Sequence, residues 1–320
     1  LAHWDAEEYG LIGSTEWIEE NKAELTKNVV LYINIDSAAS GENFSASAVP
    51  SLDEFIQEVI KEFEDPKTKK SIFERLWQQQ NKKEFKRLKK IVPDTAKIKI
   101  GRLGSGSDYT AFLQHAGISS LSMSFRGRYG VYHSILDNFF WMKNWGDPTF
   151  EYHVTMSKIA GLMALRFAQA DLFPFDYTNY AETIVEHLQD LEKSLKGKFL
   201  EVPLDFSQAK EKAKEWQWVA ETLNEKINSA LASGNSISKL NDFLMQIERD
   251  LTEAKGLPTR DWFKHRIYAP GFYTGYAAKP LPGIAEAAER EDWQTAQQEL
   301  SLLIQVLERA IQTTNKANAL

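Results

Sequence analysis

The sequence predicts an α/β fold with a mostly parallel sheet sandwiched by helices, followed by an all-α helical domain. Two observations support this prediction. Strand and helix patterns alternate over the first half of the chain, and strand patterns stop after Pro174. A chain of 320 residues is also long enough for about two domains. We therefore expect one domain over residues 1–172 and a second over residues 173–320.

The first half reads as strands and helices separated by turns. The run 29–35 is apolar throughout, which is typical of a strand buried on both faces of a parallel sheet. Asp147 followed by Pro148 predicts a helix N-cap and the first helical residue. In chain order we expect a helix over 14–25, a strand over 29–35, a loop rich in Ser, Ala and Gly over 37–49, a helix over 51–63, a basic segment over 67–99, strands over 98–103 and 118–125 with a helix between them, and a long helix from 147 through 167.

The second half contains only helix patterns and loops. Apolar residues recur at helical spacing over 177–195, 205–232, 236–254 and 293–315, and a loop rich in Gly, Pro and Tyr spans 268–282. The apolar faces of these four predicted helices exceed what one small bundle needs. The spacing predicts that the last helix buries Trp293, Ala296, Leu300, Leu303, Leu307, Ala310 and Ile311.

Composition excludes several classes of protein. Lys and Arg number 38 against 45 Asp and Glu, and the net charge of −7 argues against a nucleic-acid or anionic-membrane binder. The basic segment 67–99 can attract an anionic partner, but we favour an amphipathic surface insertion. The absence of Cys excludes disulfides and thiolate metal sites. No apolar run approaches the roughly 20 residues that span a bilayer, and no signal peptide pattern is present. The N-glycosylation acceptor pattern Asn43-Phe44-Ser45 slightly favours a secreted or lumenal protein.

Four residues have the chemistry of a metal site. Glu7 and Glu8 precede a helix, Asp36 ends an apolar run, and His133 lies in a loop. In open α/β sheets such positions can converge, and acids with a histidine suit zinc. One carboxylate can bind a metal while its neighbour accepts a proton from the attacking water. Each residue also has a structural explanation: a solvated acidic pair, a helix N-cap and a packed histidine. By themselves these residues leave both interpretations open.

Two other motifs are rejected. The segment Gly104-Ser105-Gly106 resembles half of a phosphate-binding loop, but it lacks the Walker lysine and a full glycine pattern. Ser105 and Ser107 do not form the Gly-x-Ser-x-Gly pattern of a serine nucleophile in the right register.

Several segments, in order along nearly the whole chain, resemble the glutamate carboxypeptidase II-like di-zinc metallopeptidases of the transferrin-receptor-like superfamily. They are residues 4–17, 32–37, 103–109, 131–134, 147–153, 172–177, 266–270 and 282–284. The resemblance implies a zinc exopeptidase fold, incomplete at its N-terminus, followed by a helical dimerisation domain. It also implies a homodimer, a peptide substrate and a place in the secretory pathway, on the lumenal or extracellular side of a membrane.

The same resemblance assigns roles to individual residues. Glu7 matches the general base of the family, and Tyr132 matches the residue that hydrogen-bonds the oxyanion. Glu8 and His133 match ligands of one zinc, and Asp36 a ligand of the second. Further matches are Glu16 and Glu19 for ligands of a structural calcium, and Gly106, Ser107 and Tyr276 for substrate-binding residues.

This chain departs from the family pattern in two ways. The chain begins abruptly, and a His and a bridging carboxylate of the family would lie before its first residue. We therefore expect the later part of a longer protein, binding fewer than two zinc ions or none without that N-terminal segment, and inactive alone. In the substrate pocket, a family Lys and Asn are replaced by Gly275 and Ser107, and two arginines by Ser122 and Ser124. We expect little preference for glutamate.

Two functions follow from these observations. The first is a zinc-dependent exopeptidase, of carboxypeptidase or aminopeptidase type, with Glu7 as general base. The alternative is a non-catalytic receptor or scaffold like the transferrin receptor. Retention of acids and a histidine at the matching loops favours the enzyme, whereas the neutral pocket residues keep the alternative open.

Overall fold

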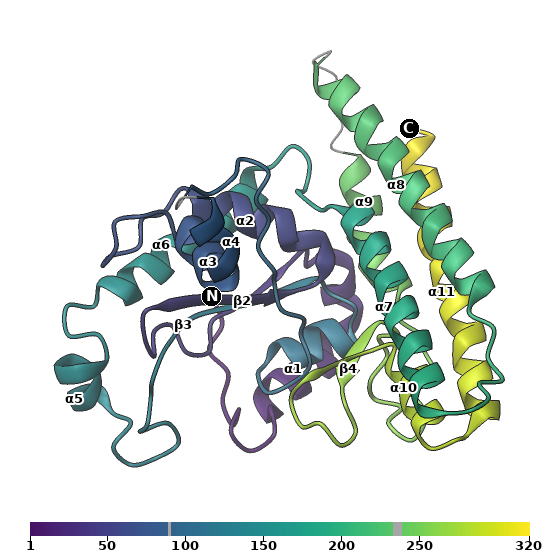
Figure 1. Ribbon diagram of the computed structural model, residues 1–320, viewed down its shortest axis with the longest axis horizontal. Coiled ribbons are helices and arrows are strands. Elements are labelled where there is room, and N and C mark those ends of the chain that lie inside the picture. Colours follow the sequence, from purple (N-terminus) through teal and green to yellow (C-terminus); the bar gives the residue numbers. More distant parts are fainter. Residues whose placement is uncertain (89–90, 233–238) are drawn as a thin grey trace.

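The computed structural model describes residues 1–88, 91–232 and 239–320. Two halves lie next to each other (Figure 1). A small sheet with its helices lies on the left, and the long helices α7 (Tyr177–Lys198), α8 (Ser207–Ala232) and α11 (Trp293–Asn318) run along one another on the right. The α/β-then-helical organisation expected from the sequence is confirmed. None of the described helices is long and apolar enough to span a membrane.

The first sheet has three strands in the order β1-β3-β2. β1 (Tyr32–Asn34) pairs parallel with β3 (Ser120–Arg126), whereas β2 (Asn43–Ala48) pairs antiparallel with it. One of these two pairings therefore departs from the mostly parallel pattern. The connection 35–42 between β1 and β2 is too short for the crossover that would make β2 run parallel to β1. The loop expected over 37–49 was wrong in part, since it contains β2.

Two of the expected strands differ in the structure. The strand expected over 29–35 spans only Tyr32–Asn34, and Tyr32 and Ile33 are half-buried. Within the part of the chain that the structure describes, β1 pairs with β3 alone. Backbone hydrogen bonds to a single neighbour therefore hold β1, and the strand is short. The strand expected over 98–103 is absent from the described structure. Only Gly101 forms a bridge there, to Ser47 of β2.

The first half also contains several helices besides this sheet. In chain order they are α1 (Ile12–Asn28), the short η1 (Pro50–Leu52), α2 (Asp53–Lys61), α3 (Ile72–Gln80), α4 (Lys82–Arg87), η2 (Ala111–His115), α5 (Phe139–Trp141), η3 (Met142–Gly146) and α6 (Glu151–Gln169). The expected apolar faces of α2 and α6 are buried, including Ile56, Ile60, Ile159 and Met163.

The start expected for the long helix at Asp147 and Pro148 was wrong. The helix begins at Glu151, after Phe150 in a left-handed conformation with φ 55°. The Asp147 carboxylate instead accepts a hydrogen bond from the backbone N–H of His153 at 3.0 Å, and His153 Nδ1 lies 2.8 Å from it. The Asp147 carboxylate thus bonds a residue inside α6 and does not cap the first residue of the helix.

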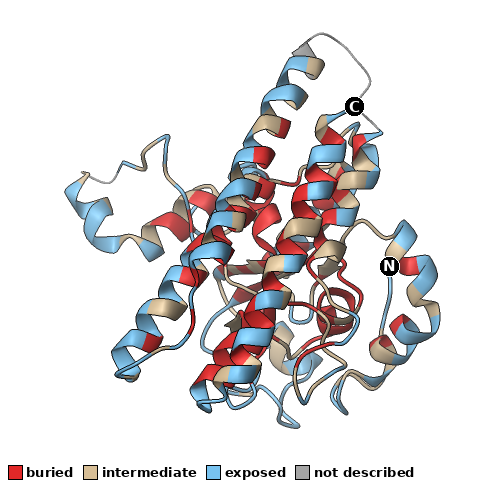
Figure 2. Ribbon diagram, turned by 90° about the vertical axis from the view of Figure 1, so that its right-hand side faces the viewer, coloured by how far each residue is buried: buried red, intermediate tan, exposed pale blue. Residues whose placement is uncertain are grey.

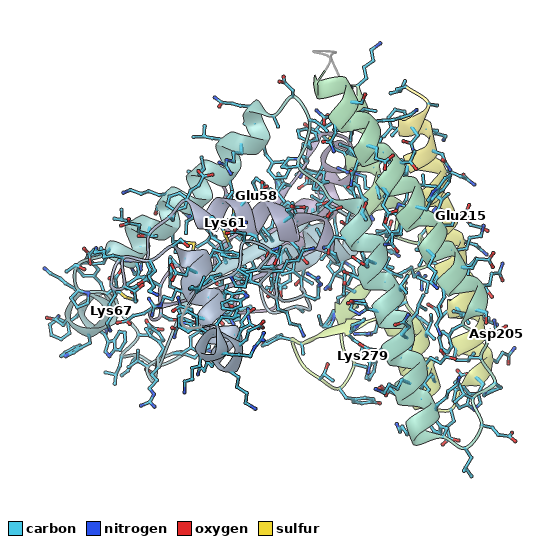
Figure 3. All side chains as sticks on the ribbon, turned by 45° about the horizontal axis from the view of Figure 1, so that its top comes forward. Glu58, Lys61, Lys67, Asp205, Glu215 and Lys279 are labelled. Carbon is cyan, nitrogen blue, oxygen red and sulfur yellow. The ribbon has the colours of Figure 1, made fainter. Side chains whose placement is uncertain are left out.

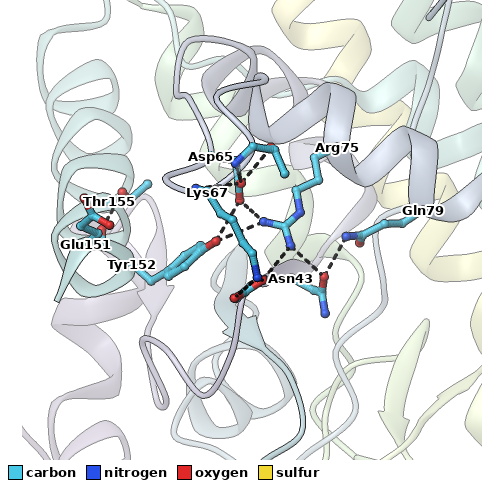
Figure 4. Close-up of polar contacts among 10 residues, drawn as sticks. Asn43, Asp65, Lys67, Arg75, Gln79, Glu151, Tyr152 and Thr155 are labelled. Carbon is cyan, nitrogen blue, oxygen red and sulfur yellow. Dashed lines mark hydrogen bonds and ion pairs between the residues drawn. The ribbon is translucent and has the colours of Figure 1, made fainter. Parts of the chain in front are cut away.

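The basic segment is an amphipathic insertion, as we favoured. Phe73, Leu76 and Trp77 are buried, and Phe85 and Leu88 pack against the core as partly buried residues. A polar network anchors the insertion (Figure 4). The Arg75 guanidinium contacts the Asp65 carboxylate, the Tyr152 hydroxyl at 3.2 Å and Asn43 Oδ1 at 3.3 Å. This network therefore links α3 to β2 and to α6.

The second half is helical with one hairpin. Besides α7, α8 and α11 it contains α9 (Leu240–Asp250) and α10 (Pro282–Glu289), and the hairpin β4 (Tyr268–Pro270) and β5 (Ala278–Pro280) lies within the segment expected as a loop. The start expected at residue 236 lies outside the described residues. Trp293 is half-buried, and the other six residues expected to be buried in α11 are buried.

Burial on the long helices is one-sided. Buried residues gather where the helices face one another and the sheet half, and exposed residues cover the outer faces (Figure 2). Charged side chains such as Asp205 and Glu215 lie on the outer surface of this half (Figure 3).

A buried polar hub joins the two halves. The Glu248 carboxylate of α9 accepts hydrogen bonds from the Tyr180 hydroxyl at 2.7 Å and from the Ser119 hydroxyl at 3.3 Å, and His265 Nε2 lies 2.9 Å from it. Glu248 and His265 are fully buried. Because Ser119 directly precedes β3, the hub connects the helical half to the strand that runs toward the candidate site.

Candidate functional site

A tight turn before α1 presents Glu7 and Glu8. The Glu7 carbonyl accepts hydrogen bonds from the N–H groups of Gly10 at 3.0 Å and Leu11 at 2.8 Å. A Cβ on Gly13 would lie 2.4 Å from the Asp5 carbonyl oxygen, so only glycine fits the approach of α1 to the turn. The turn therefore holds the two adjacent carboxylates at a defined place in front of the helix.

His133 and Glu8 meet from distant loops. His133 Nε2 lies 3.2 Å from Glu8 Oε1, and both side chains are largely exposed, at 56% and 70%. His133 has a left-handed backbone with φ 58°, and its ring stacks on that of Tyr132 with centroids 3.8 Å apart. The loop brings an imidazole nitrogen to a carboxylate oxygen across 125 positions of sequence.

Negative charge is concentrated around this pair. Burial raises the pKa of Glu7, and the charges of Asp36, Asp108 and Glu8 raise it further, whereas His133 opposes them. Burial also raises the pKa of Asp36, followed by the charges of Asp108 and Glu8. Carboxylates that repel one another in this way are stabilised by a bound cation.

Tyr132 shares the same surroundings. Its side chain is 62% exposed. Burial raises the pKa of the phenol, and the charges of Asp36, Glu8 and Glu7 raise it further. The phenol therefore stays protonated and able to donate a hydrogen bond next to the carboxylates.

The residues matched to substrate binding come together, but they differ in exposure. The backbone N–H of Ser105 donates to the Tyr276 carbonyl at 2.9 Å, and a Cβ on Gly106 would lie 2.8 Å from Tyr276 Cγ. The Tyr276 side chain is 75% exposed. Ser107 is 4% exposed, and its hydroxyl accepts a hydrogen bond from Asn34 Nδ2 at 3.0 Å.

Two neighbouring polar residues, Asp108 and Asn34, were not predicted from the sequence as site residues. Asp108 is 8% exposed, and its Oδ1 has no hydrogen-bond partner among the described residues. Asn34 bonds Ser107 and also donates to Ser122 Oγ at 3.3 Å. A signal existed for both, since each lies inside a segment that carries the family resemblance, two residues or fewer from an assigned residue.

The chemistry of the donors fits a zinc ion, but their number is small. Two ligands of one tetrahedral zinc lie about 3.3 Å apart when each bond is about 2.0–2.1 Å, close to the separation of the His133 and Glu8 atoms. Within residues 1–88, 91–232 and 239–320, no group of three or more His, Asp or Glu side chains is placed to hold a metal. Glu16 and Glu19 lie exposed on α1, and Glu19 accepts a hydrogen bond from Trp262 Nε1.

Comparison with known proteins identifies the family. Residues 1–146 match the model of peptidase family M28, and residues 199–315 match the transferrin receptor-like dimerisation domain. Residues 1–146 therefore match part of a peptidase domain of family M28. Peptidases of this family are zinc-dependent.

Curated relatives match this chain over most of its length. It is 38% identical over 308 residues to "Probable glutamate carboxypeptidase LAMP1" of Arabidopsis thaliana, covering 94% of this chain and 42% of the relative. It is 37% identical over 335 residues to "Probable glutamate carboxypeptidase AMP1" of the same plant, covering 99% and 43%. To "Aminopeptidase NAALADL1" of Rattus norvegicus it is 30% identical over 340 residues, covering 98% and 44%. The chain thus spans less than half the length of these curated relatives, and the resemblance to the glutamate carboxypeptidase-like family is confirmed.

Proposed function

We propose that this chain forms part of a zinc-dependent exopeptidase, of carboxypeptidase or aminopeptidase type. The observation that carries the proposal is the approach of His133 Nε2 to Glu8 Oε1 at 3.2 Å, with Glu7 directly beside Glu8. A scaffold has no need to bring an imidazole and two carboxylates from separate loops to one exposed place. Family M28, whose model matches residues 1–146, has the chemistry that such residues serve.

In this proposal each residue has a separate task. Glu8 and His133 hold one zinc ion, and Asp36 contributes to a second. Zinc bound there would supply Lewis-acid activation of water and of the peptide carbonyl. Glu7 accepts the proton of the attacking water and returns it to the leaving amine. The Tyr132 hydroxyl donates a hydrogen bond to the oxygen that becomes negative in the transition state.

The ligand set of this chain is incomplete in the same proposal. A closed or catalytic zinc site uses at least three protein ligands. This chain supplies two ligands, Glu8 and His133, for one ion and a single ligand, Asp36, for the other. The remaining ligands would come from residues outside this chain, so the 320 residues alone bind zinc weakly and do not hydrolyse peptides.

Substrate preference is proposed from the pocket residues. Gly275, Ser122 and Ser124 are small and neutral where the family places cationic side chains, and Ser107 is occupied with Asn34. We expect a broader peptidase, with Gly106 and Tyr276 shaping the pocket. Kinetic comparison of N-acetyl-aspartyl-glutamate with neutral peptides on the full-length protein tests this. A strong preference for the acidic peptide would contradict it.

The remaining parts of the proposal concern assembly and surroundings. We propose a homodimer formed through the helical half, a calcium ion at Glu16 and Glu19, and a lumenal or extracellular location. Sedimentation analysis tests the dimer. Loss of thermal stability on chelation, reversed by calcium and abolished in Glu16→Gln, tests the calcium site.

A two-part assay on the full-length protein tests the reaction itself. Glu7→Gln should keep its zinc and lose activity by at least about 100-fold, the usual contribution of a general base. His133→Ala should lose zinc as well as activity. A full-length protein that contains no zinc and cleaves no peptide would instead favour the non-catalytic, transferrin-receptor-like function.

A further inference from the structure

A groove with a volume of about 610 Å³ lies where the two halves meet. Its walls come from α1, from the end of η2, from α9 and from the segment 252–264. None of the residues of the candidate zinc site lines it. The side chains used below are Lys22, Lys27, His115, Arg249, Glu253 and Lys264.

The lining is strongly positive on a chain whose net charge is −7. It carries four fixed cations, Lys22, Lys27, Arg249 and Lys264, and one carboxylate, Glu253. Glu253 is already engaged, because its Oε1 accepts from the N–H of Ala254 at 2.9 Å and its Oε2 from Arg309 at 3.3 Å. The cations therefore lack a carboxylate of their own within the groove.

The individual side chains show this excess of positive charge. The two terminal nitrogens of Arg249 donate to the carbonyls of Met245 and Val29, while its buried Nε has no partner among the described residues. No ion pair to Arg249 occurs in the described part of the chain. Burial lowers the pKa of Lys22, and the charge of Lys264 lowers it further, with Glu19 opposing.

His115 faces the same positive surroundings. Its Nδ1 donates to the Trp262 carbonyl at 2.8 Å, so Nε2 can donate to an anion only when the ring is protonated. Burial lowers the pKa of the imidazole, and the charges of Lys22 and Lys264 act in the same direction. An anion in the groove would reverse that effect.

We propose that this groove binds a phosphate-type oxyanion, either inorganic phosphate or the phosphate group of a small metabolite. Lysine and arginine are the usual protein partners of phosphate oxygens, and here they converge from three separate elements. The volume lies within the range of small-molecule sites and exceeds the need of inorganic phosphate, so a larger molecule carrying the group also fits. A bound anion would contact α1 and α9 together and so connect the two halves.

Calorimetric titration of the 320-residue chain tests the proposal. The probes are sodium phosphate, glycerol phosphate and glycerol, at constant ionic strength set with chloride. Phosphate should bind, and Lys22→Gln should weaken binding about tenfold, the effect of losing one charge-assisted hydrogen bond. Lys158→Gln, an exposed lysine of α6 outside the groove, is the matched control and should bind as the parent does. Phosphate should also shift the NMR signal of the His115 ring.

The outcomes separate the sources and can overturn the proposal. Tighter binding of glycerol phosphate than of phosphate, with none for glycerol, identifies a phosphorylated metabolite, and equal binding identifies free phosphate. Absence of binding at about 10 mM of either anion overturns the proposal. So does unchanged affinity in Lys22→Gln, or equal weakening in Lys158→Gln. If Lys22→Gln does not fold, the phosphate affinity of Lys27→Gln and the NMR signal of the His115 ring test the proposal in its place.

Discussion

Replacing Arg75 by Met should destabilise the first half by breaking a buried ion pair. Asp65 is 1% exposed and contacts the Arg75 guanidinium. After the substitution, the carboxylate keeps hydrogen bonds from Thr68, at 2.7 Å from its N–H and 2.8 Å from its hydroxyl, from the Lys67 N–H at 3.2 Å and from the Tyr152 hydroxyl at 3.4 Å. The carboxylate loses its cationic partner, and the Tyr152 hydroxyl loses the hydrogen bond that Arg75 donates to it.

The magnitude follows from the kind of contact that is removed. Removing one partner of a buried ion pair costs about 3–5 kcal/mol, because the other charge stays buried without its partner. The hydrogen bonds from Thr68 and Lys67 remain, so we expect the lower end, about 3 kcal/mol at neutral pH. The control is Arg87→Met. Arg87 is 73% exposed and pairs with exposed Glu84, so its loss should change the free energy of unfolding by at most about 0.5 kcal/mol.

The pH dependence gives a second check on the same variant. Burial acts to raise the pKa of Asp65, but hydrogen bonds from Thr68 and the pairing with Arg75 outweigh it and hold the pKa below its ordinary 3.8. A carboxyl whose native pKa is lowered contributes stability that is complete above its ordinary pKa and is lost as pH falls through the native pKa. The difference between the parent and Arg75→Met should therefore shrink as pH falls below 3.8.

Urea unfolding followed by circular dichroism, at neutral and at acidic pH, measures both effects. The reasoning is refuted if Arg75→Met costs no more than Arg87→Met at neutral pH. A large cost that stays constant into the acidic range would show that lost packing, not the Asp65 charge, is responsible.

Three further predictions concern other parts of the fold. Glu248→Ala should cost about 3–5 kcal/mol in urea unfolding because it leaves buried donors unpaired, and Glu248→Gln should cost clearly less. Gly256→Ala should lower the melting temperature, since a Cβ there would lie 1.9 Å from the Asp261 carbonyl oxygen at φ +71°, whereas Gly161→Ala, in open space within α6, should stabilise by about 0.5–1 kcal/mol. Burial lowers the pKa of His187 to about 4, so NMR should show a neutral ring at pH values where exposed histidines are protonated, and this histidine should cost stability as pH falls from 6.5 toward that value.

Long helices were predictable because their signal is local. The apolar positions of α6 and α11 recur every three or four residues, and a helix with such a stripe must bury it. Met163, Phe167, Leu300 and Leu303 are accordingly buried as expected. Helix starts were less predictable, because a carboxylate such as that of Asp147 can satisfy a backbone N–H within a turn as well as at an N-cap.

β2 was missed because four of its six residues are serine or alanine. Phe44, Ala46 and Ala48 are buried in alternation with exposed or half-buried positions, so the period of two was present. Serine and alanine over residues 45–48 resemble loop composition, and alanine adds little strand preference. Pairing with β3 decides the structure of this segment, and that contact is not visible in the local sequence.

The candidate site could be predicted only in part from the sequence. Family resemblance pointed to Glu7, Glu8 and His133, and the structure brings Glu8 and His133 together. The buried carboxylate of Asp108 was not singled out, because its effect on Glu7 and Asp36 arises through space. No pattern along the chain shows which charges face one another after folding.

Zinc titration of the 320-residue chain by calorimetry tests the central claim most directly. The account predicts at most one weakly bound ion, whose binding disappears in Glu8→Gln and in His133→Ala and persists in His153→Ala, a histidine paired with Asp147 elsewhere in the structure. Two tightly bound ions would contradict the account, and so would zinc binding that survives the loss of the His133 imidazole.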